Sequence, residues 1–215
     1  MLTPHTHSQT GRALALAVAL LASTSCASEM TRSGKSPAFL IIDSLAGASG
    51  ATSGQFGSQL NSDVLTLVDQ TINGATVKVP TVFNDLGQVT LRAALKNPGT
   101  AASPTSPTEI NAITVTRYHV RFRRSDGRER EGFDVPFAFD GGVTGTVASN
   151  RTTLTFDLVR HSMKEEPPLS PLIRGGGFGE ISTIAEITFY GHDQAGNEVS
   201  VMGMITVNFG DFGDP

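Results

Sequence analysis

Apolar residues recur at every second position in several short segments of this chain, and this alternation limits the folds that it can adopt. Leu154, Phe156 and Leu158 alternate with polar residues, and Val89 and Leu91 begin a similar series. A period of two places one set of side chains on one face of a β-strand, whereas a helix repeats every 3.6 residues. No sustained period of 3.6 occurs beyond the apolar run near the N-terminus. The sequence therefore predicts an all-β protein.

Turn signals separate the predicted strands. Asn73-Gly74 is a strong hairpin signal because both residues tolerate a positive φ, and Ser125-Asp126-Gly127 has similar turn chemistry. The chain contains 23 Gly and 11 Pro, which suits a protein with many turns. Short strands at this spacing favour a β-sandwich or a barrel. Before the final hairpin, the predicted strands are 38–45, 63–69, 75–80, 87–97, 111–124, 133–139, 141–147 and 152–160.

The longest of these strands, 111–124, changes the parity of its apolar positions. Ile113 and Val115 share one parity, whereas Tyr118 and Val120 have the other. A bulge inserts one extra residue into a strand and changes which face the following side chains point to. We therefore expect a bulge or bend at residues 116–117.

Three segments have the composition of loops. Residues 46–59 are rich in Gly, Ser and Ala, residues 97–109 in Pro, Thr and Ser, and residues 163–180 are irregular, with four glycines. We expect 163–180 to cross between two sheets, and its alternative role is contact with a partner, because long loops are often functional. A division into two domains within 97–109 is an alternative to one domain over 37–215.

An apolar run precedes the only cysteine of the chain. Residues 13–23 give 11 apolar or small residues, too few for a membrane-spanning helix, which needs about 20. The run has the features of the hydrophobic region of a secretory signal peptide. Cys26 follows a series of small residues, and a single cysteine cannot form an internal disulfide. Residues 27–36 are small, polar and aperiodic, as in a flexible tether.

The segment LLASTSC, which ends at Cys26, resembles the lipobox of bacterial lipoproteins, with Ser23 at a position that is usually Leu. The resemblance implies a lipoprotein signal peptide over 1–25, acylation of Cys26 with chains such as palmitate, and a tether over 26–36. It also implies a location in the bacterial cell envelope, at the outer membrane or the cell surface, with the membrane contacted through the lipid anchor. The alternative is an ordinary signal-peptidase cut near 22–27 that leaves a free cysteine.

The stretch FYGHDQAGNEVSVMGMITVNF (189–209) predicts a hairpin. Asp193 and Asn197 can bond their own backbone, Gly196 supplies a positive φ, and alternate apolar residues return on one face. The turn resembles the last hairpin of bacterial immunoglobulin-like domains, which implies an immunoglobulin-like β-sandwich over 37–215. The wider pattern of 117–139 and 187–215 is similar to uncharacterised bacterial lipoproteins. The Cys-Trp-Cys core of immunoglobulins is absent, since the chain has no Trp and one Cys.

The sequence predicts neither an enzyme nor a cofactor. Nucleophilic catalysis needs a nucleophile, a base and an orienting group together. The chain has no GxSxG or SxxK motif. We expect His119 to face solvent, His161 to end a strand and His192 to lie in the turn of the final hairpin. An unrecognised hydrolase site remains a third-ranked alternative.

Metal and nucleic acid are not expected ligands. Asp140, Asp193 and the acids of 209–215 would offer oxygens to Ca²⁺ if their turns clustered, but no EF-hand spacing is present and turn roles are favoured. Three well-separated histidines and an acylated cysteine do not make a zinc site. The net charge is −4, and carboxylates interrupt the basic segment 121–131, which predicts a hairpin tip and no nucleic-acid surface.

These observations predict a non-catalytic cell-envelope lipoprotein that serves as a structural or protein-partner-binding module. The alternative is a secreted β-sandwich that binds a glycan or another ligand. Glycan-binding faces usually expose aromatic residues, whereas this chain has no Trp and two tyrosines, Tyr118 and Tyr190. The composition therefore favours an envelope protein as the partner.

Overall fold

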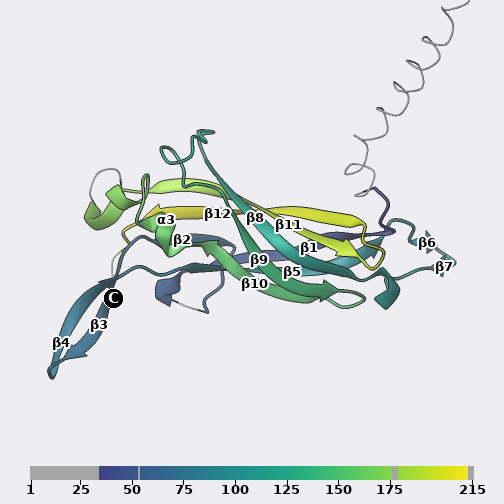
Figure 1. Ribbon diagram of the computed structural model, residues 1–215, viewed down its shortest axis with the longest axis horizontal. Helices are drawn as coiled ribbons and strands as arrows, with labels where there is room; N and C mark the ends of the chain where they lie inside the picture. Colours follow the sequence, from purple (N-terminus) through teal and green to yellow (C-terminus); the bar gives the residue numbers. More distant parts are fainter. Residues whose placement is uncertain (1–33, 53, 176–178, 213–215) are drawn as a thin grey trace, which may run out of the picture.

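Two β-sheets form the body of the protein (Figure 1). The computed structural model describes residues 34–52, 54–175 and 179–212, so the predicted signal peptide and Cys26 lie outside the described residues. The three-stranded sheet has the order β1 (Ala38–Ala48), β5 (Asp85–Leu95), β10 (Thr152–Val159). The five-stranded sheet has the order β2 (Gln59–Asp63), β12 (Glu198–Gly210), β11 (Ile181–Asp193), β8 (Ile113–Arg124), β9 (Phe139–Val147). The predicted all-β class is confirmed.

Short elements connect these strands. Two separate hairpins are formed by β3 (Thr66–Ile72) with β4 (Ala75–Thr81) and by β6 (Gly99–Thr100) with β7 (Ser103–Pro104). The helical pieces are η2 (Gly50–Thr52), η3 (Glu109–Asn111), α3 (His161–Lys164) and η4 (Ser170–Gly175). Each sheet takes strands from both sides of residues 97–109, because β5 pairs with β10 and β2 pairs with β12.

A cluster of aromatic rings joins the two sheets. Tyr118 of β8 lies 4.9 Å from Phe156 of β10 between ring centroids, and Phe156 lies 5.2 Å from Phe189 of β11. All three side chains are buried. Gly87 of β5 lies directly beneath the Phe156 ring, where any Cβ would collide with it. Alternating apolar positions from both sheets thus meet in one core.

The bulge predicted at residues 116–117 is confirmed. The register of β8 shifts between Val115 and Arg117 against β9, and it shifts at the same place against β11. Thr116 is the extra residue and is exposed. Because of it, Val115 and Tyr118 both point into the core although an odd number of positions separates them.

The turn predictions are confirmed at both hairpins. Asn73 and Gly74 have φ values of 53° and 82°, as a tight two-residue hairpin turn requires. At the final hairpin, Gly196 has a φ of 79°, and the Asp193 carboxylate accepts hydrogen bonds from the backbone of Ala195 and Asn197.

The strand predicted at 133–139 is wrong, since only Phe139 of this segment belongs to a strand. The Arg130 carbonyl accepts hydrogen bonds from the three successive N–H groups of residues 133–135, which curls the chain, and Pro136 has no N–H to donate to a ladder. The strand predicted at 63–69 is in fact the end of β2 and the start of β3, because the chain turns at 64–65.

Residues 163–180 cross between the sheets, as the sequence predicts. They follow β10 of the three-stranded sheet and lead into β11 of the five-stranded sheet. The crossover is not only a surface loop, because Leu169 and Leu172 are fully buried in the core. The prediction that His161 ends a strand is wrong, since β10 ends at Val159 and His161 begins α3. His192 is also not in the turn as predicted, because it lies in β11 next to the turn.

The aromatic cluster predicts a large packing penalty for its loss. Phe156→Ala is expected to lower the free energy of unfolding by about 3–5 kcal/mol, because it leaves a cavity between the sheets. Phe137→Ala is the matched control, since Phe137 is 53% exposed, and we expect a change of about 0.5 kcal/mol or less. Urea denaturation followed by circular dichroism measures both. Equal losses for the two variants would contradict the assignment of Phe156 to the core.

Candidate functional site

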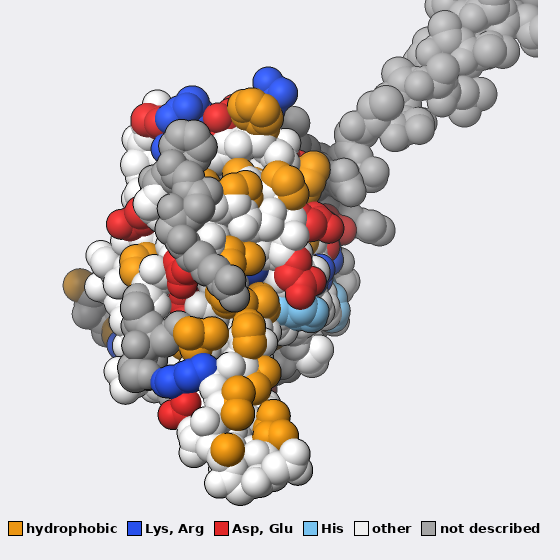
Figure 2. Space-filling view, turned by 90° about the vertical axis from the view of Figure 1, so that its left-hand side faces the viewer, with side chains coloured by type: hydrophobic (Ala, Val, Ile, Leu, Met, Phe, Trp, Pro, Cys, Tyr) orange, Lys and Arg blue, Asp and Glu red, His pale blue; other side chains and the backbone are white. Residues whose placement is uncertain are grey.

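The β3–β4 hairpin projects from one end of the body (Figure 1). In the part of the chain that the structure describes, no other strand pairs with either of its edges. All residues from Asp69 to Lys78 are exposed. Figure 2 shows hydrophobic side chains along this projection. The hairpin is thus an arm outside the core. Its two strands pair with each other from Thr66 and Thr81 at the base to Ile72 and Ala75 at the tip.

The two faces of this arm differ in chemistry. Cross-strand partners share a face, and successive pairs alternate between faces. Val68 pairs with Val79, Gln70 with Val77, and Ile72 with Ala75, so these residues share one face. We call the set Val68, Ile72, Ala75, Val77 and Val79 the apolar face. Gln70 is the polar residue on this face. The opposite face carries Leu67 with Pro80 near the base, a Lys78–Asp69 ion pair at 3.3 Å, and the threonines 71 and 76 near the tip, so its outer part is polar.

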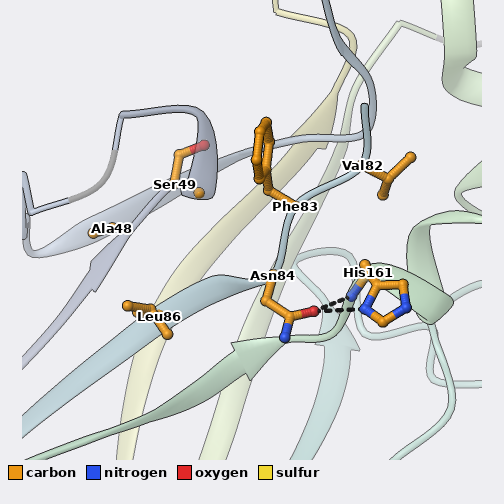
Figure 3. Close-up of a pocket in the computed structure, with 8 residues that line it drawn as sticks. Ala48, Ser49, Val82, Phe83, Asn84, Leu86 and His161 are labelled. Carbon is orange, nitrogen blue, oxygen red and sulfur yellow. Dashed lines mark hydrogen bonds between the residues drawn. The ribbon is translucent and has the colours of Figure 1, made fainter. Parts of the chain in front are cut away.

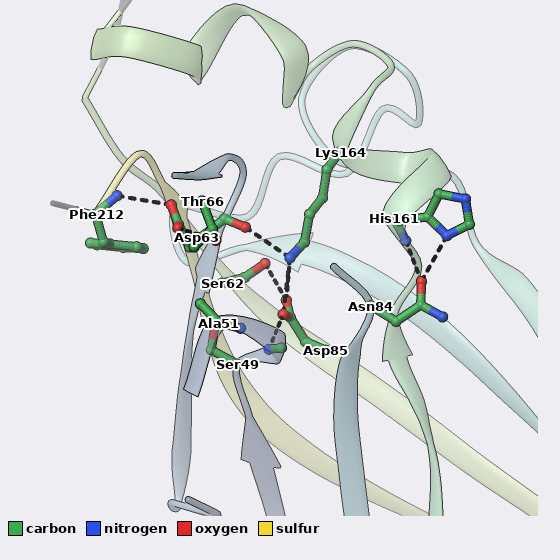
Figure 4. Close-up of polar contacts among 11 residues, drawn as sticks. Ser49, Ala51, Ser62, Asp63, Thr66, Asn84, Asp85, His161, Lys164 and Phe212 are labelled. Atoms are coloured by element: carbon green, nitrogen blue, oxygen red, sulfur yellow. Dashed lines mark hydrogen bonds and ion pairs between the residues drawn. The ribbon is translucent and has the colours of Figure 1, made fainter. Parts of the chain in front are cut away.

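A buried lysine holds the base of the arm (Figure 4). Lys164 comes from α3 and is 1% exposed. Its Nζ donates a hydrogen bond to the Asp85 carboxylate at 2.9 Å and another to the Asp63 carbonyl oxygen at 2.8 Å. Asp63 precedes β3, and Asp85 follows β4. One ammonium group therefore joins both ends of the arm to the crossover segment.

The two carboxylates have further partners. Ser62 donates a hydrogen bond to Asp85 at 2.6 Å, and the Gly50 N–H donates to the same carboxylate at 2.9 Å. Thr66 donates to the Asp63 carboxylate at 2.7 Å. We call Ser62, Asp63, Asp85 and Lys164 the clamp. Burial lowers the pKa of Lys164 below its ordinary value, and the attraction of Asp85 opposes this shift.

The clamp explains why an arm with little core of its own has a fixed base. A two-stranded hairpin is at best marginally stable alone. Removing one partner of a buried pair is costly, because it leaves an uncompensated charge in the interior. The clamp thus fixes the direction of the arm, and a pre-ordered surface loses less entropy on binding than a mobile one.

A pocket lies beside the base of the arm (Figure 3). Its volume is about 390 Å³, and it is lined by Ala48, Ser49, Gly50, Val82, Phe83, Asn84, Leu86 and His161. Gly47 and Gly87 face the core, so their neighbours Ala48 and Leu86 face outward from the three-stranded sheet. The pocket therefore opens on the outer side of that sheet.

His161 is held at the pocket by Asn84. The Asn84 Oδ1 atom accepts a hydrogen bond from the backbone N–H of His161 at 2.7 Å and lies 2.9 Å from its Nδ1. An amide oxygen can only accept, so the proton of a neutral His161 ring is on Nδ1. Asn84 thus fixes both the orientation and the tautomer of the ring.

The histidines and acids considered from the sequence do not converge. His119 contacts Asp140 at 3.3 Å on the outer face of the five-stranded sheet and is partly exposed, and His192 contacts the Asp193 carbonyl oxygen. Burial raises the pKa of Asp193, but hydrogen bonds from Asn197, Ser36 and Ala195 outweigh this effect, so the pKa lies below its ordinary value. Among the described residues, no group of three or more His, Cys, Asp or Glu could hold a metal ion. Cys26 and Asp214 lie outside these residues.

No family model matches this sequence, and no curated protein matches it. In the described part of the chain, no helix has the length and apolar character needed to cross a membrane.

Sequence reasoning missed the clamp and the exposure of the arm. Lys164 lies in a charged stretch that looks solvated, and nothing local to Asp85 indicates that it is buried. The apolar face did have a signal. Its members alternate on both sides of the Asn73-Gly74 turn, but the same alternation occurs in core strands.

The clamp predicts a strong effect of removing Lys164. Lys164→Met is expected to lower the free energy of unfolding by about 3–5 kcal/mol, because Asp85 is left buried without its cation. Lys96→Met is the control, since Lys96 makes an exposed bond to the Gly34 carbonyl, and we expect a change of about 0.5 kcal/mol or less. Adding Asp85→Leu to Lys164→Met is expected to recover part of the loss. A Lys164→Met variant as stable as the parent would contradict the clamp.

Proposed function

We propose that this protein is a non-catalytic, lipid-anchored module of the bacterial cell envelope that presents the β3–β4 arm to a protein partner. The observation that carries the proposal is the apolar face on a clamped arm. Ile72 is 47% exposed and Val77 is 44% exposed. Contiguous exposed apolar residues mark interaction sites, and a hairpin with open edges can also pair its backbone with a partner strand.

The position of the arm suits presentation away from a membrane. The described chain enters β1 at Ala38, and the arm lies at the opposite end of the body (Figure 1). β1 has 11 residues, which span about 36 Å at the rise of an antiparallel strand. A tether over 26–36, anchored through an acylated Cys26, would attach to the near end of the body. The apolar face would then be at the far end.

The strand arrangement supports an immunoglobulin-like β-sandwich as the finer fold. In chain order, β1, β5 and β10 would be strands A, B and E, and β8, β11 and β12 would be strands C, F and G, with β9 beside C. Tyr118 of β8 packs on Phe189 of β11, where immunoglobulins have a Trp on strand C against the B–F disulfide. A ring cluster would thus replace that core.

Tyrosine exposure favours a protein partner over a glycan. Tyr118 is buried, and the Arg117 guanidinium covers Tyr190 at 3.8 Å from the ring centroid. Neither ring offers an open platform to a sugar. Glycan binding remains the second candidate because Phe133 and Phe137 are exposed on the segment before β9, although Arg130 lies over Phe133.

Replacing apolar residues of the apolar face with threonine tests the proposed function. The full chain is recovered from native membranes in mild detergent, and its stoichiometric companion is quantified. Ile72→Thr with Val77→Thr is expected to reduce capture of the companion at least 10-fold, because each exposed anchor contributes on the order of 1 kcal/mol.

The matched control is Thr71→Val with Thr76→Val, which changes the opposite face of the same arm by the inverse substitution. We expect it to retain the companion. Equal capture by the two double variants would contradict a role for the apolar face.

Acylation of Cys26 has its own test. The intact mass of the membrane-extracted protein is expected to correspond to a chain that starts at Cys26 and carries acyl groups. Cys26→Ala is expected to move the protein to the aqueous phase after detergent phase separation, because each buried CH₂ contributes about 0.8 kcal/mol to anchoring. An unmodified N-terminus would rule out the lipid anchor and leave a secreted domain.

A further inference from the structure

We propose that the pocket lined by Ala48, Val82, Phe83, Asn84, Leu86 and His161, with Ser49 and Gly50, is a second binding site, which takes one uncharged apolar side chain of the protein partner. The side chain is the size of leucine or phenylalanine. This inference rests on the proposed function, since it names what the same partner inserts beside the arm.

The lining selects for an apolar group. Ala48, Val82, Phe83 and Leu86 supply aliphatic or aromatic surface, and the lining contains no Lys, Arg, Asp or Glu. A charged side chain would therefore lose its hydration there without gaining an opposite charge. The volume of about 390 Å³ lies at the small end of the range for ligand pockets, which suits a single side chain and its backbone.

The pocket also has donors for the backbone that would carry such a side chain. Both protein contacts of the Asn84 side chain use its oxygen. Within the described residues, its amide nitrogen donates to no acceptor, and the Ser49 hydroxyl only accepts, from the Ala51 N–H. Carbonyl groups of a peptide are the acceptors that these two donors can bind.

Continuity with the arm identifies the occupant as the same partner. Val82, Phe83 and Asn84 directly follow β4, which ends at Thr81. Three extended residues span about 10 Å, so a polypeptide lying along the arm reaches the pocket within a few residues. The apolar face and the pocket would then act as two parts of one interface, with the pocket receiving an anchor side chain.

The test uses amino-acid amides as probes for the anchor. Saturation-transfer NMR on the full chain is run with N-acetyl-leucinamide, N-acetyl-phenylalaninamide and N-acetyl-lysinamide. We expect transfer to the first two and not to the lysine derivative. Leu86→Trp fills the pocket and is expected to reduce the transfer at least 5-fold. Thr90→Trp lies on the same strand and the same face, four residues away, and is expected to leave it unchanged.

Several results would overturn the inference. These are no transfer to the apolar probes, equal transfer to the lysine derivative, or transfer that survives Leu86→Trp. Val82→Trp provides a second filling variant if Leu86→Trp does not fold. Ile72→Thr with Val77→Thr is expected to bind the probes normally. If this double variant captured the companion as well as the parent does, the arm would be refuted as the interface. Failure of the parent chain to bind the probes would refute the pocket alone.

Discussion

The buried contact between Lys164 and Asp85 connects parts of the chain that are far apart in sequence. Lys164 lies in the crossover between the sheets, Asp85 begins β5, and Asp63, whose carbonyl oxygen Lys164 also binds, ends β2. β2 belongs to one sheet and β5 to the other, so the ammonium group ties both sheets to the base of the arm. An ion pair at this depth is a weak source of stability compared with apolar packing, but it strongly disfavours arrangements that separate its partners.

The arm depends on this contact because it has no core. Among the described residues, no side chain of its apolar face belongs to the core, and no other strand pairs with its edges. A clamped base and an unpartnered tip are what a presented binding element needs. In the proposed interface, the pocket beside the base would add a place for a side chain. Its lining includes Ala48, at the other end of β1 from Ala38, and the arm projects from the end of the body opposite the entry into β1 (Figure 1).

Local patterns in the sequence predict much of the fold. The Asn73-Gly74 turn, the bulge at Thr116 and the alternation of Leu154 and Phe156 follow from φ preferences and the two-residue period. The strand wrongly predicted at 133–139 shows the limit of local patterns. Three N–H groups there donate to the Arg130 carbonyl, and no sequence pattern indicates this arrangement. The burial of Lys164 could not be predicted from the sequence, because it depends on contact with Asp85, which lies 79 residues earlier in the chain. Alternation also cannot tell a core strand from an exposed arm.

The central claim is that the clamp fixes the direction of the arm, and spin-label distances test it most directly. Labels are placed at Thr76→Cys on the arm and Ser200→Cys on β12, in a chain with Cys26→Ser, and double electron–electron resonance is recorded with and without Lys164→Met. The account predicts one narrow distance distribution with Lys164 and a broad one without it. A broad distribution in both chains, or a narrow one in both, would contradict the account.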